Sequence, residues 1–151
     1  MKPNLTGVRP IRPADLNSVI RLDALLTGQS KRMYWEEVFD RLEKDSSCLG
    51  FSYEGPDGME GYLFGEVRAF EFGSDLCGWI TALGVRPESG RRGRASSLLE
   101  QAKSRFAQMG VVSIRTMVNR TDVPVLSLFR RCGFVGGPFV QLELELEELD
   151  S

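Results

Sequence analysis

Hydrophobic residues recur along the chain with two different periods, and the alternation of these periods predicts a mixed succession of strands and helices. A short apolar run over residues 5–11 is predicted to form the first strand. From Asp15 to Gly28 the apolar residues follow helical spacing, which predicts a first helix. A second helix is expected from an N-cap at Ser30 through Leu42, because serine accepts hydrogen bonds from free helix-terminal N–H groups.

The middle of the chain has the pattern of antiparallel strands. Residues 48–53 and 60–72 are apolar runs on either side of a Gly-Pro-Asp-Gly turn sequence, and we expect them to form a hairpin. A further strand is predicted over residues 76–85. Gly84 lies inside that strand, where a glycine indicates either a bulge or a close backbone approach.

Helical spacing returns at about residue 93 and predicts a helix that ends near Met109 and Gly110. Residues 111–118 are rich in β-branched side chains and are predicted to form another strand. A short helix follows, with Thr121 or Asp122 as its N-cap. The last segment alternates strictly, which predicts a half-buried strand with an acidic outer face. Its apolar positions are Val140, Leu142, Leu144 and Leu146, and its polar positions are Gln141, Glu143, Glu145 and Glu147.

The composition is that of one domain spanning residues 1–151, with 42% hydrophobic and 26% charged residues. The formal net charge of −2 argues against binding to nucleic acid or to a membrane through bulk positive charge. The N-terminus lacks the apolar core of a signal peptide, and no apolar run reaches membrane length. We therefore expect a cytoplasmic protein.

Cysteine and histidine content narrows the chemistry. The three cysteines, Cys48, Cys77 and Cys132, are widely spaced in apolar surroundings, which is typical of free thiols and not of a zinc site or a disulfide framework. The chain contains no histidine. A His-based triad, a His metal site and an imidazole base are therefore excluded, and no metal site is expected.

Residues 86–94 concentrate arginine and glycine between a predicted strand and a predicted helix. A helix start presents unpaired backbone N–H groups and the positive end of the helix dipole. Gly93 has no Cβ to hold an anion away from that backbone, Ala95 adds little bulk, and Ser96 follows in the first turn. The loop also carries three cations suited to phosphate oxygens, Arg91, Arg92 and Arg94. Together these features predict a pyrophosphate cradle.

The alternative for this loop is a solvated basic segment in which the glycines only form a turn. Two familiar phosphate-binding sequences are absent. The loop has no Gly-Lys-Ser/Thr ending, which argues against a nucleoside-triphosphate P-loop, and it has no GxGxxG dinucleotide fingerprint.

Two motifs in this half of the chain carry a family resemblance. The first is Val85-x-Pro87-Glu88, followed by Gly93-x-Ala95 and Leu98-Leu99-Glu100. The second is Val118-Asn119, followed by Leu128-Phe129-x-x-x-Gly133-Phe134. They resemble the acyl-CoA loop (Arg/Gln-x-x-Gly-x-Gly/Ala) and the V-N…LYxxxGF segment of the GNAT N-acetyltransferase superfamily. Gly90 stands at the usual leading Arg/Gln position of the loop, with Arg91 beside it. The resemblance extends over residues 6–147.

The resemblance implies a single mixed α/β domain with a central sheet of about six to seven strands, about four flanking helices and a splayed strand pair at the CoA site. It implies acetyl-CoA, or another acyl-CoA, as co-substrate. The pyrophosphate is then expected on the backbone of residues 91–96. The pantetheine arm is expected beside the strand backbone, with further contacts from the second motif: Leu83, Gly84, Val85, Asn119 and Phe129. Asn119 has the alternative role of a strand-end turn former.

The groups that move protons depart from the family pattern. The strand position that often holds a catalytic glutamate is Thr81, and the tyrosine often found in the second motif is Phe129. Glu66 and Glu71 on the preceding predicted strand are the nearest candidate bases, with solvated strand-face charges as the alternative. Ser127 is a candidate catalytic hydroxyl on the short helix, with a packing role as its alternative.

The function that the resemblance implies is N-acetyl transfer to a primary amine of a small molecule, a peptide N-terminus or a lysine, by direct attack on the thioester. One alternative is a non-catalytic acyl-CoA-binding domain of the same fold. Another is a general anion- or nucleotide-binding protein. The expected partner is an amine acceptor, the connection over residues 27–35 is expected to border its site or to pack on the sheet, and a homodimer is left open.

Overall fold

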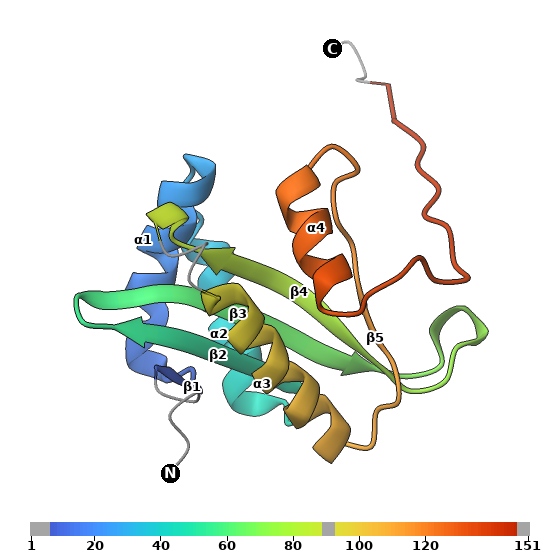
Figure 1. The fold of residues 1–151 in the computed structure, drawn as a ribbon, viewed down its shortest axis with the longest axis horizontal. Coiled ribbons are helices and arrows are strands. Elements are labelled where there is room, and N and C mark those ends of the chain that lie inside the picture. Colours follow the sequence, from blue (N-terminus) through green and yellow to red (C-terminus); the bar gives the residue numbers. More distant parts are fainter. Residues whose placement is uncertain (1–6, 89–92, 148–151) are drawn as a thin grey trace.

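The computed structural model describes residues 7–88 and 93–147, which form a five-stranded sheet with helices on both faces (Figure 1). The strands lie side by side in chain order: β1 (Val8–Pro10), β2 (Cys48–Gly55), β3 (Gly58–Arg68), β4 (Cys77–Val85) and β5 (Ile114–Thr116). Neighbours from β1 to β4 pair antiparallel, and β5 pairs parallel to β4. This confirms the expected mixed α/β architecture, although the described residues form five strands where six to seven were expected.

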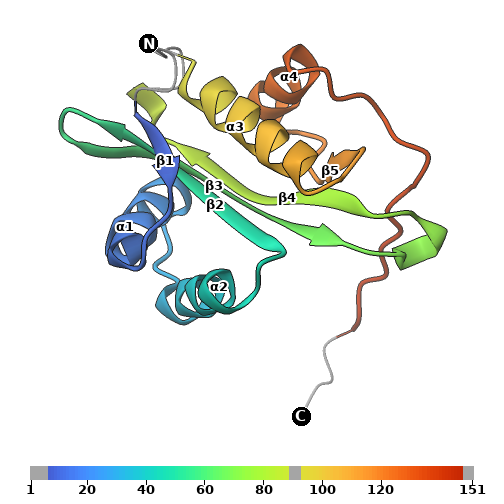
Figure 2. The same cartoon turned by 90° about the horizontal axis from the view of Figure 1, so that it is seen from below.

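Two helical layers enclose the sheet. Helices α1 (Leu16–Thr27) and α2 (Arg32–Lys44) cover one face, and α3 (Arg94–Gln108) and α4 (Val123–Arg131) cover the other (Figure 2). Successive side chains of a strand point to opposite faces, so β3 contributes to both cores. Leu63 packs in the core on the α3 side, whereas Tyr62 and Phe64 pack against α1 and α2.

The first two helices follow the predicted pattern with one correction. α1 ends at Gly28, whose left-handed φ of 78° lets its N–H reach the carbonyl of Ala24. α2 begins at Arg32 with Lys31 at the N-cap and no side-chain cap, so the prediction of Ser30 as N-cap is wrong. None of the helices in the described part of the chain has the length and apolar character needed to cross a bilayer.

The β2–β3 hairpin is confirmed, but β3 ends at Arg68 and does not continue to Phe72 as expected. The connection to β4 contains the short 3-10 helix η3 (Glu71–Gly73). Phe70 and Phe72 adopt positive φ angles of 61° and 53°, which extended strand backbone cannot accommodate. Both phenylalanines are therefore exposed loop residues, although their apolar side chains had suggested a strand.

A bulge lies in β4, at a different residue from the glycine noted in the sequence. Phe64 pairs with Ala82 and Gly65 pairs with Ile80, which leaves Thr81 as the extra residue of β4. Gly84 pairs in regular register with Tyr62. Of the two interpretations of Gly84, the bulge is wrong and the close approach is confirmed, because a Cβ there would lie 2.7 Å from Tyr62 Cζ.

The C-terminal third contains less sheet than predicted. β5 spans three residues, where a strand over residues 111–118 was expected. α4 has Asp122 at its N-cap, with the carboxylate accepting a hydrogen bond from the Val125 N–H at 3.3 Å. The predicted strand over residues 140–147 is not part of the sheet, because the segment runs away from β5 instead of along it (Figure 1).

Candidate functional site

The splayed strand pair expected from the sequence lies at the C-terminal half of β4. β5 pairs with β4 only at Gly78, Trp79 and Ile80, and the Thr116 hydroxyl donates to the Ile80 carbonyl at 3.1 Å. Beyond the Thr81 bulge, β4 keeps its pairing with β3 on one side but has no described strand on the other. The β4 edge at residues 82–85 therefore carries unpaired backbone groups, which an extended ligand can bind as an added strand would.

The start of α3 is the other part of the predicted CoA site, because a helix start presents free backbone N–H groups. Gly93 is the residue before the first turn and has a left-handed φ of 75°, a conformation that disfavours any side chain. Its carbonyl accepts hydrogen bonds from both the N–H and the hydroxyl of Ser97, each at 3.0 Å. The two arginines predicted to bind phosphate, Arg91 and Arg92, lie outside the described residues.

Arg94 faces the protein. Its Nε lies 3.2 Å from Glu60 Oε1, and its guanidinium stacks 4.5 Å from the centroid of the Tyr53 ring. These contacts tie the start of α3 to the β2–β3 hairpin. The charge of Arg94 is therefore engaged by protein groups, and its contact with phosphate stays a prediction.

The second sequence motif packs against the first. Cys132 Sγ lies 4.0 Å from Ser96 Oγ, which joins the end of α4 to the first turn of α3, and Ala95 beside it is buried. Phe129 is 5% exposed, and its ring meets Phe134 edge-on at 5.0 Å. Its ring is thus part of the α3-side core.

Two further predicted site residues, Asn119 and Ser127, lie in a turn and on α4, respectively. The Asn119 side-chain oxygen accepts hydrogen bonds from the Thr121 N–H at 2.9 Å and from the Thr121 hydroxyl at 2.7 Å. This is the geometry of a turn-forming asparagine, which was the alternative interpretation. Ser127 is half-buried on α4, across the sheet from α1 and α2. Neither placement tests a role in binding or catalysis.

The two candidate glutamates lie away from the C-terminal end of β4. Glu66 pairs with Trp79 in the β3–β4 register, near the start of β4. Burial acts to raise the pKa of Glu66, but hydrogen bonds from Arg41 at 2.6 Å and Arg68 at 3.0 Å outweigh it and lower the pKa overall. The lowered pKa makes Glu66 a weaker base than an ordinary glutamate, and its catalytic role stays a prediction. Glu71 is exposed in η3, at the opposite end of β4 from Val85 (Figure 1).

A pocket of about 420 Å³ lies where the α1–α2 connection meets the bulge of β4. We name it the Asp23 pocket. It is lined by Asp23, Lys31, Tyr34, Trp35, Tyr62, Thr81, Ala82 and Leu83. The last three residues are β4 positions on the side of the bulge where β5 no longer pairs. The pocket therefore shares one short stretch of β4 with the unpaired strand edge.

Asp23 gives the pocket a buried negative charge. It is 5% exposed and accepts a hydrogen bond from the Trp35 indole N–H at 2.9 Å. Lys31 forms an ion pair with it at 3.3 Å from the pocket rim. Burial, together with the nearby Asp23 charge, raises the pKa of the Tyr62 phenol well above its ordinary value of 10.0. Tyr62 therefore stays protonated at neutral pH and offers an O–H donor.

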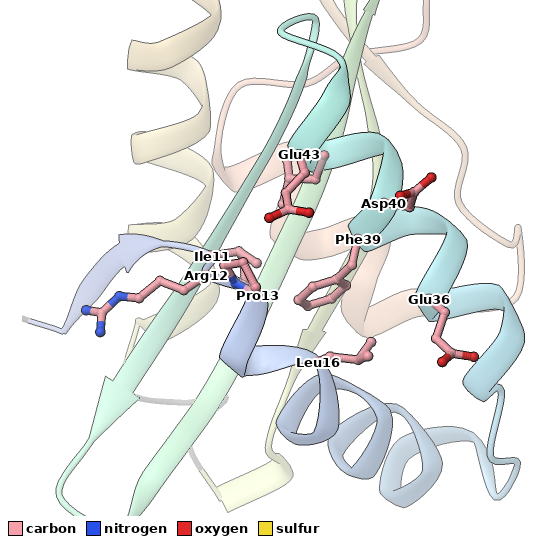
Figure 3. A pocket seen from close by; sticks show the side chains of 9 residues that line it. Ile11, Arg12, Pro13, Leu16, Glu36, Phe39, Asp40 and Glu43 are labelled. Carbon is pink, nitrogen blue, oxygen red and sulfur yellow. The ribbon is translucent and has the colours of Figure 1, made fainter.

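A second pocket of about 320 Å³ lies on the same helical layer, between α2 and the 3-10 helix η2 (Pro13–Asp15) that precedes α1. Figure 3 shows Phe39 and Leu16 in its apolar interior, with the carboxylates of Glu36 and Asp40 on α2 at its border. No residue of β4 lines it, so it does not adjoin the unpaired strand edge.

The sequence pattern did not identify Asp23 or Tyr62 as site residues. A signal for Asp23 was present, because it follows Val19 by four positions and so falls on the buried face of α1. A charged residue on an apolar helix face indicates a specific partner or a site. Tyr62 carried no such signal, since an aromatic residue in a strand is ordinary core composition.

The solved structures most similar to this one include aminoglycoside N-acetyltransferases. AAC(6')-Iy, in complex with the bisubstrate analogue CoA-S-monomethyl-acetylneamine, has a TM-score of 0.80 at 13% identity, over 92% of this chain and 97% of that chain. AAC(6')-Ih from Acinetobacter baumannii has a TM-score of 0.76 at 16% identity, over 93% and 98%. A transcriptional regulator from Bacillus halodurans C-125 has a TM-score of 0.78 at 15% identity, over 92% and 98%. At these identities the likeness shows the fold.

Sequence comparison supplies the family. No curated protein sequence matches the chain. The family model described as the acetyltransferase (GNAT) family matches residues 18–134, which include most of α1, the Thr81 bulge, the glycine–arginine loop and α4. Since this match covers well over half of the chain, the protein belongs to the acetyltransferase (GNAT) family.

Proposed function

We propose that the protein is an N-acetyltransferase that moves the acetyl group of acetyl-CoA to a primary amine held in the Asp23 pocket. One observation carries the proposal: residues 81–83 line that pocket and also begin the β4 edge from which β5 has diverged. An amine in the pocket and a thioester along the edge would meet at the same stretch of backbone. Proximity of this kind is itself a large part of catalysis.

The residues present fit a CoA-type ligand. The unpaired backbone of residues 82–85 suits an extended amide-bearing arm, and the first turn of α3 suits a pyrophosphate. The glycine at position 93 leaves open space beside that turn, since a Cβ built there meets nothing within 4 Å. Acetyl-CoA would supply the activated acyl group, and in family members the thioester is the donor.

The pocket would select and orient the amine. A primary amine is mainly protonated at neutral pH, with an ordinary pKa of about 10.4 for a lysine side chain. Asp23 would attract this cation, and the Tyr62 hydroxyl and the Trp35 ring would form the wall of its site. Transfer requires the amine to lose a proton, form the new C–N bond and displace the thiolate. Overall, one proton returns to the sulfur and one is released to solvent.

The acceptor class follows from this charge. A buried carboxylate favours a cationic amine on a small molecule, a peptide N-terminus or a lysine over a neutral nucleophile. The structural neighbours described as aminoglycoside N-acetyltransferases act on amines of that chemical class, which supports a small cationic acceptor here. Neither Glu66 nor Glu71 is needed for this arrangement.

The test is thiol release from acetyl-CoA with a panel of polyamines, aminoglycosides, lysine peptides and peptide N-termini. Asp23→Asn keeps an acceptor for the Trp35 N–H but removes the charge. We expect its KM for a responsive amine to rise about 10- to 100-fold, the equivalent of a charge-assisted contact of roughly 1.5–3 kcal/mol. CoA affinity should change little.

Asp40→Asn is the matched control, because Asp40 borders the other pocket and pairs with Lys44 on the surface of α2. It should leave KM unchanged. Equal effects of the two substitutions on KM would show that Asp23 does not bind the acceptor amine. If the protein binds acetyl-CoA but no amine releases thiol, the non-catalytic acyl-CoA-binding alternative replaces the enzyme.

A further inference from the structure

The Asp23 pocket holds one negative and one positive side chain in contact with each other. Among the described residues that line it, Asp23 is the only acidic and Lys31 the only basic one. The Lys31 Nζ lies 3.3 Å from Asp23 Oδ2 and 3.4 Å from Oδ1. The lining therefore carries no net charge, although an amine that enters the pocket at neutral pH is mainly cationic.

The two charges differ in how firmly they are held. The Asp23 side chain is 7% exposed, and its Oδ2 also accepts the Trp35 indole N–H. The Lys31 side chain lies at the rim and is 37% exposed. Its backbone is fixed, because the Lys31 carbonyl accepts the Trp35 backbone N–H at 3.1 Å. The carboxylate is thus a rigid part of the pocket, whereas the ammonium can move on a flexible stem from a fixed root.

A ligand with only a positive charge fits this arrangement poorly. Its ammonium must either share the Asp23 carboxylate with Lys31, close to a like charge, or displace Lys31 from its ion pair. A ligand that also carries an anion beside its amine has no such cost, because the anion pairs with Lys31 while the ammonium pairs with Asp23. The charges of the pocket therefore favour a zwitterion.

We propose that the Asp23 pocket is a site for a free amino acid, which is the acceptor of the acetyl group. The inference rests on the proposed function, since it takes this pocket as the amine site. A free amino acid has one carbon between its ammonium and its carboxylate, so the two groups can meet neighbouring partners at once. Its α-amine attacks the thioester. The new C–N bond forms, the C–S bond breaks, one proton returns to the sulfur and one is released to solvent.

The remaining walls suit an apolar side chain on that amino acid. The Trp35 ring meets the Tyr34 ring edge-on at 5.0 Å and the Tyr62 ring at 5.4 Å, and all three residues line the pocket. Ala82 and Leu83 line it from β4. Aromatic rings arranged in this way bind aliphatic and aromatic groups. The volume of about 420 Å³ lies within the range of small-molecule sites, roughly 300–1,000 Å³.

The test compares ligands that differ by one carboxylate: L-phenylalanine with phenethylamine, and L-leucine with isoamylamine. Calorimetric titration of the full chain in the presence of CoA measures their Kd values without acetyl transfer. We expect the parent protein to bind the better of the two amino acids at least about 10-fold more tightly than the matching amine, because the carboxylate adds a charge-assisted contact.

Substitutions at the two charged residues should affect the ligands differently. Lys31→Met should raise the Kd of that amino acid about 10- to 100-fold. The Kd of the matching amine should stay unchanged or fall, because the competitor for Asp23 is gone. Lys31→Arg should keep the preference for the amino acid, and Asp23→Asn should weaken the binding of both ligands.

Lys44→Met is the matched control, because Lys44 pairs with Asp40 at 2.9 Å on the surface of α2, outside the pocket. It should keep the parent's preference. Thermal unfolding checks that each variant is folded, since Lys31→Met leaves a buried carboxylate without its cation. The comparison in the parent protein needs no variant. Equal or tighter binding of the amines, no binding of either amino acid, or an equal loss for both ligand types in folded Lys31→Met would overturn the proposal.

Thiol release from acetyl-CoA tests the proposed function separately. If an amino acid binds with the expected preference but releases no thiol, the proposed transfer fails and the amino-acid site is supported. If amines without a carboxylate release thiol and neither amino acid does, the transferase stands and the amino-acid acceptor is overturned.

Discussion

Tyr62 and Gly84 are paired across β3 and β4, and the phenol of Tyr62 occupies the space that a side chain at Gly84 would need. A side chain at Gly84 would place its Cβ 2.7 Å from Tyr62 Cζ and 2.8 Å from the hydroxyl oxygen. The pair thus sets the position of the Tyr62 hydroxyl in the Asp23 pocket. It also links that pocket to the β4 edge where the cofactor is proposed to bind.

The first prediction is that Gly84→Ala displaces the Tyr62 ring. Overpacking of this kind should cost about 1–3 kcal/mol of unfolding free energy and should raise the KM for the amine. Urea denaturation and steady-state kinetics measure the two effects. In a Tyr62→Leu background the ring is gone and the remaining close atom is Leu26 Cδ1 at 2.9 Å, the flexible end of a side chain, so the same alanine should cost less. A full additional penalty in the double variant would contradict the contact.

The second prediction separates the arginines of the glycine-rich loop by role. Arg94→Ala should weaken folding by up to about 1 kcal/mol, because it breaks a partly exposed pair with Glu60 and the stacking on Tyr53. Its CoA affinity should change little. Arg91→Ala combined with Arg92→Ala should instead weaken CoA binding and flatten its dependence on salt.

Calorimetric titration of CoA at two ionic strengths measures this contrast. Parent-like CoA affinity in the double-alanine variant at low salt would indicate that the two arginines belong only to a solvated loop. A large loss of CoA affinity in a folded Arg94→Ala variant would indicate that Arg94 contacts the phosphates.

The third prediction concerns Asp15, which holds the start of α1 against β1. Its carboxylate accepts hydrogen bonds from Arg9 at 2.7 Å and 2.8 Å and from the Arg12 N–H at 2.7 Å. The Arg9 contact, which outweighs burial, lowers the pKa of Asp15 below its ordinary value of 3.8. The charged form is therefore the one that stabilises the fold, and Asp15→Asn should lose about 1.5–3 kcal/mol at neutral pH.

The lowered pKa of Asp15 also predicts how its contribution to the free energy of unfolding changes with pH. Because the folded pKa lies below the unfolded value, the contribution of Asp15 is fully present above about pH 4 and is lost as the pH falls through the folded pKa. The difference in unfolding free energy between parent and variant should therefore shrink at acidic pH. A difference that stays constant between pH 7 and pH 3 would show that the loss arises from packing alone.

The sequence predicted correctly those helices, turns and caps that depend on residues close together in the chain. The helix after Gly93, the β2–β3 hairpin and the cap at Asp122 follow from side-chain periodicity, turn residues and capping chemistry within a few positions. The prediction of a strand over residues 60–72 failed at its end, where the backbone conformation departs from a strand although the side chains remain apolar. Phe70 and Phe72 read as strand residues, but their positive φ angles place them in a loop.

The sequence pattern could not predict contacts between side chains that are far apart in the chain. The sequence could not show that the hairpin brings Glu60, 34 positions away, and Tyr53 against Arg94, whose contact with phosphate stays a prediction. Nor could it show that α2 places Arg41 beside Glu66, whose role as a base stays a prediction. In both cases a charge that is free in the sequence is paired by the tertiary fold, and its chemistry changes with its partner.

The sequence alone therefore determined the family motifs, the order of helices and strands and the glycine-rich start of α3, because each depends on residues close together in the chain. The tertiary structure alone decided that Thr81 and not Gly84 is the bulge, because a bulge is a mismatch between two strands. It also decided that Asp23 and Tyr62 share a pocket. Residues 140–147 have the sequence of a strand, but among the described residues they pair with no other strand, and pairing between distant segments is decided by the tertiary fold.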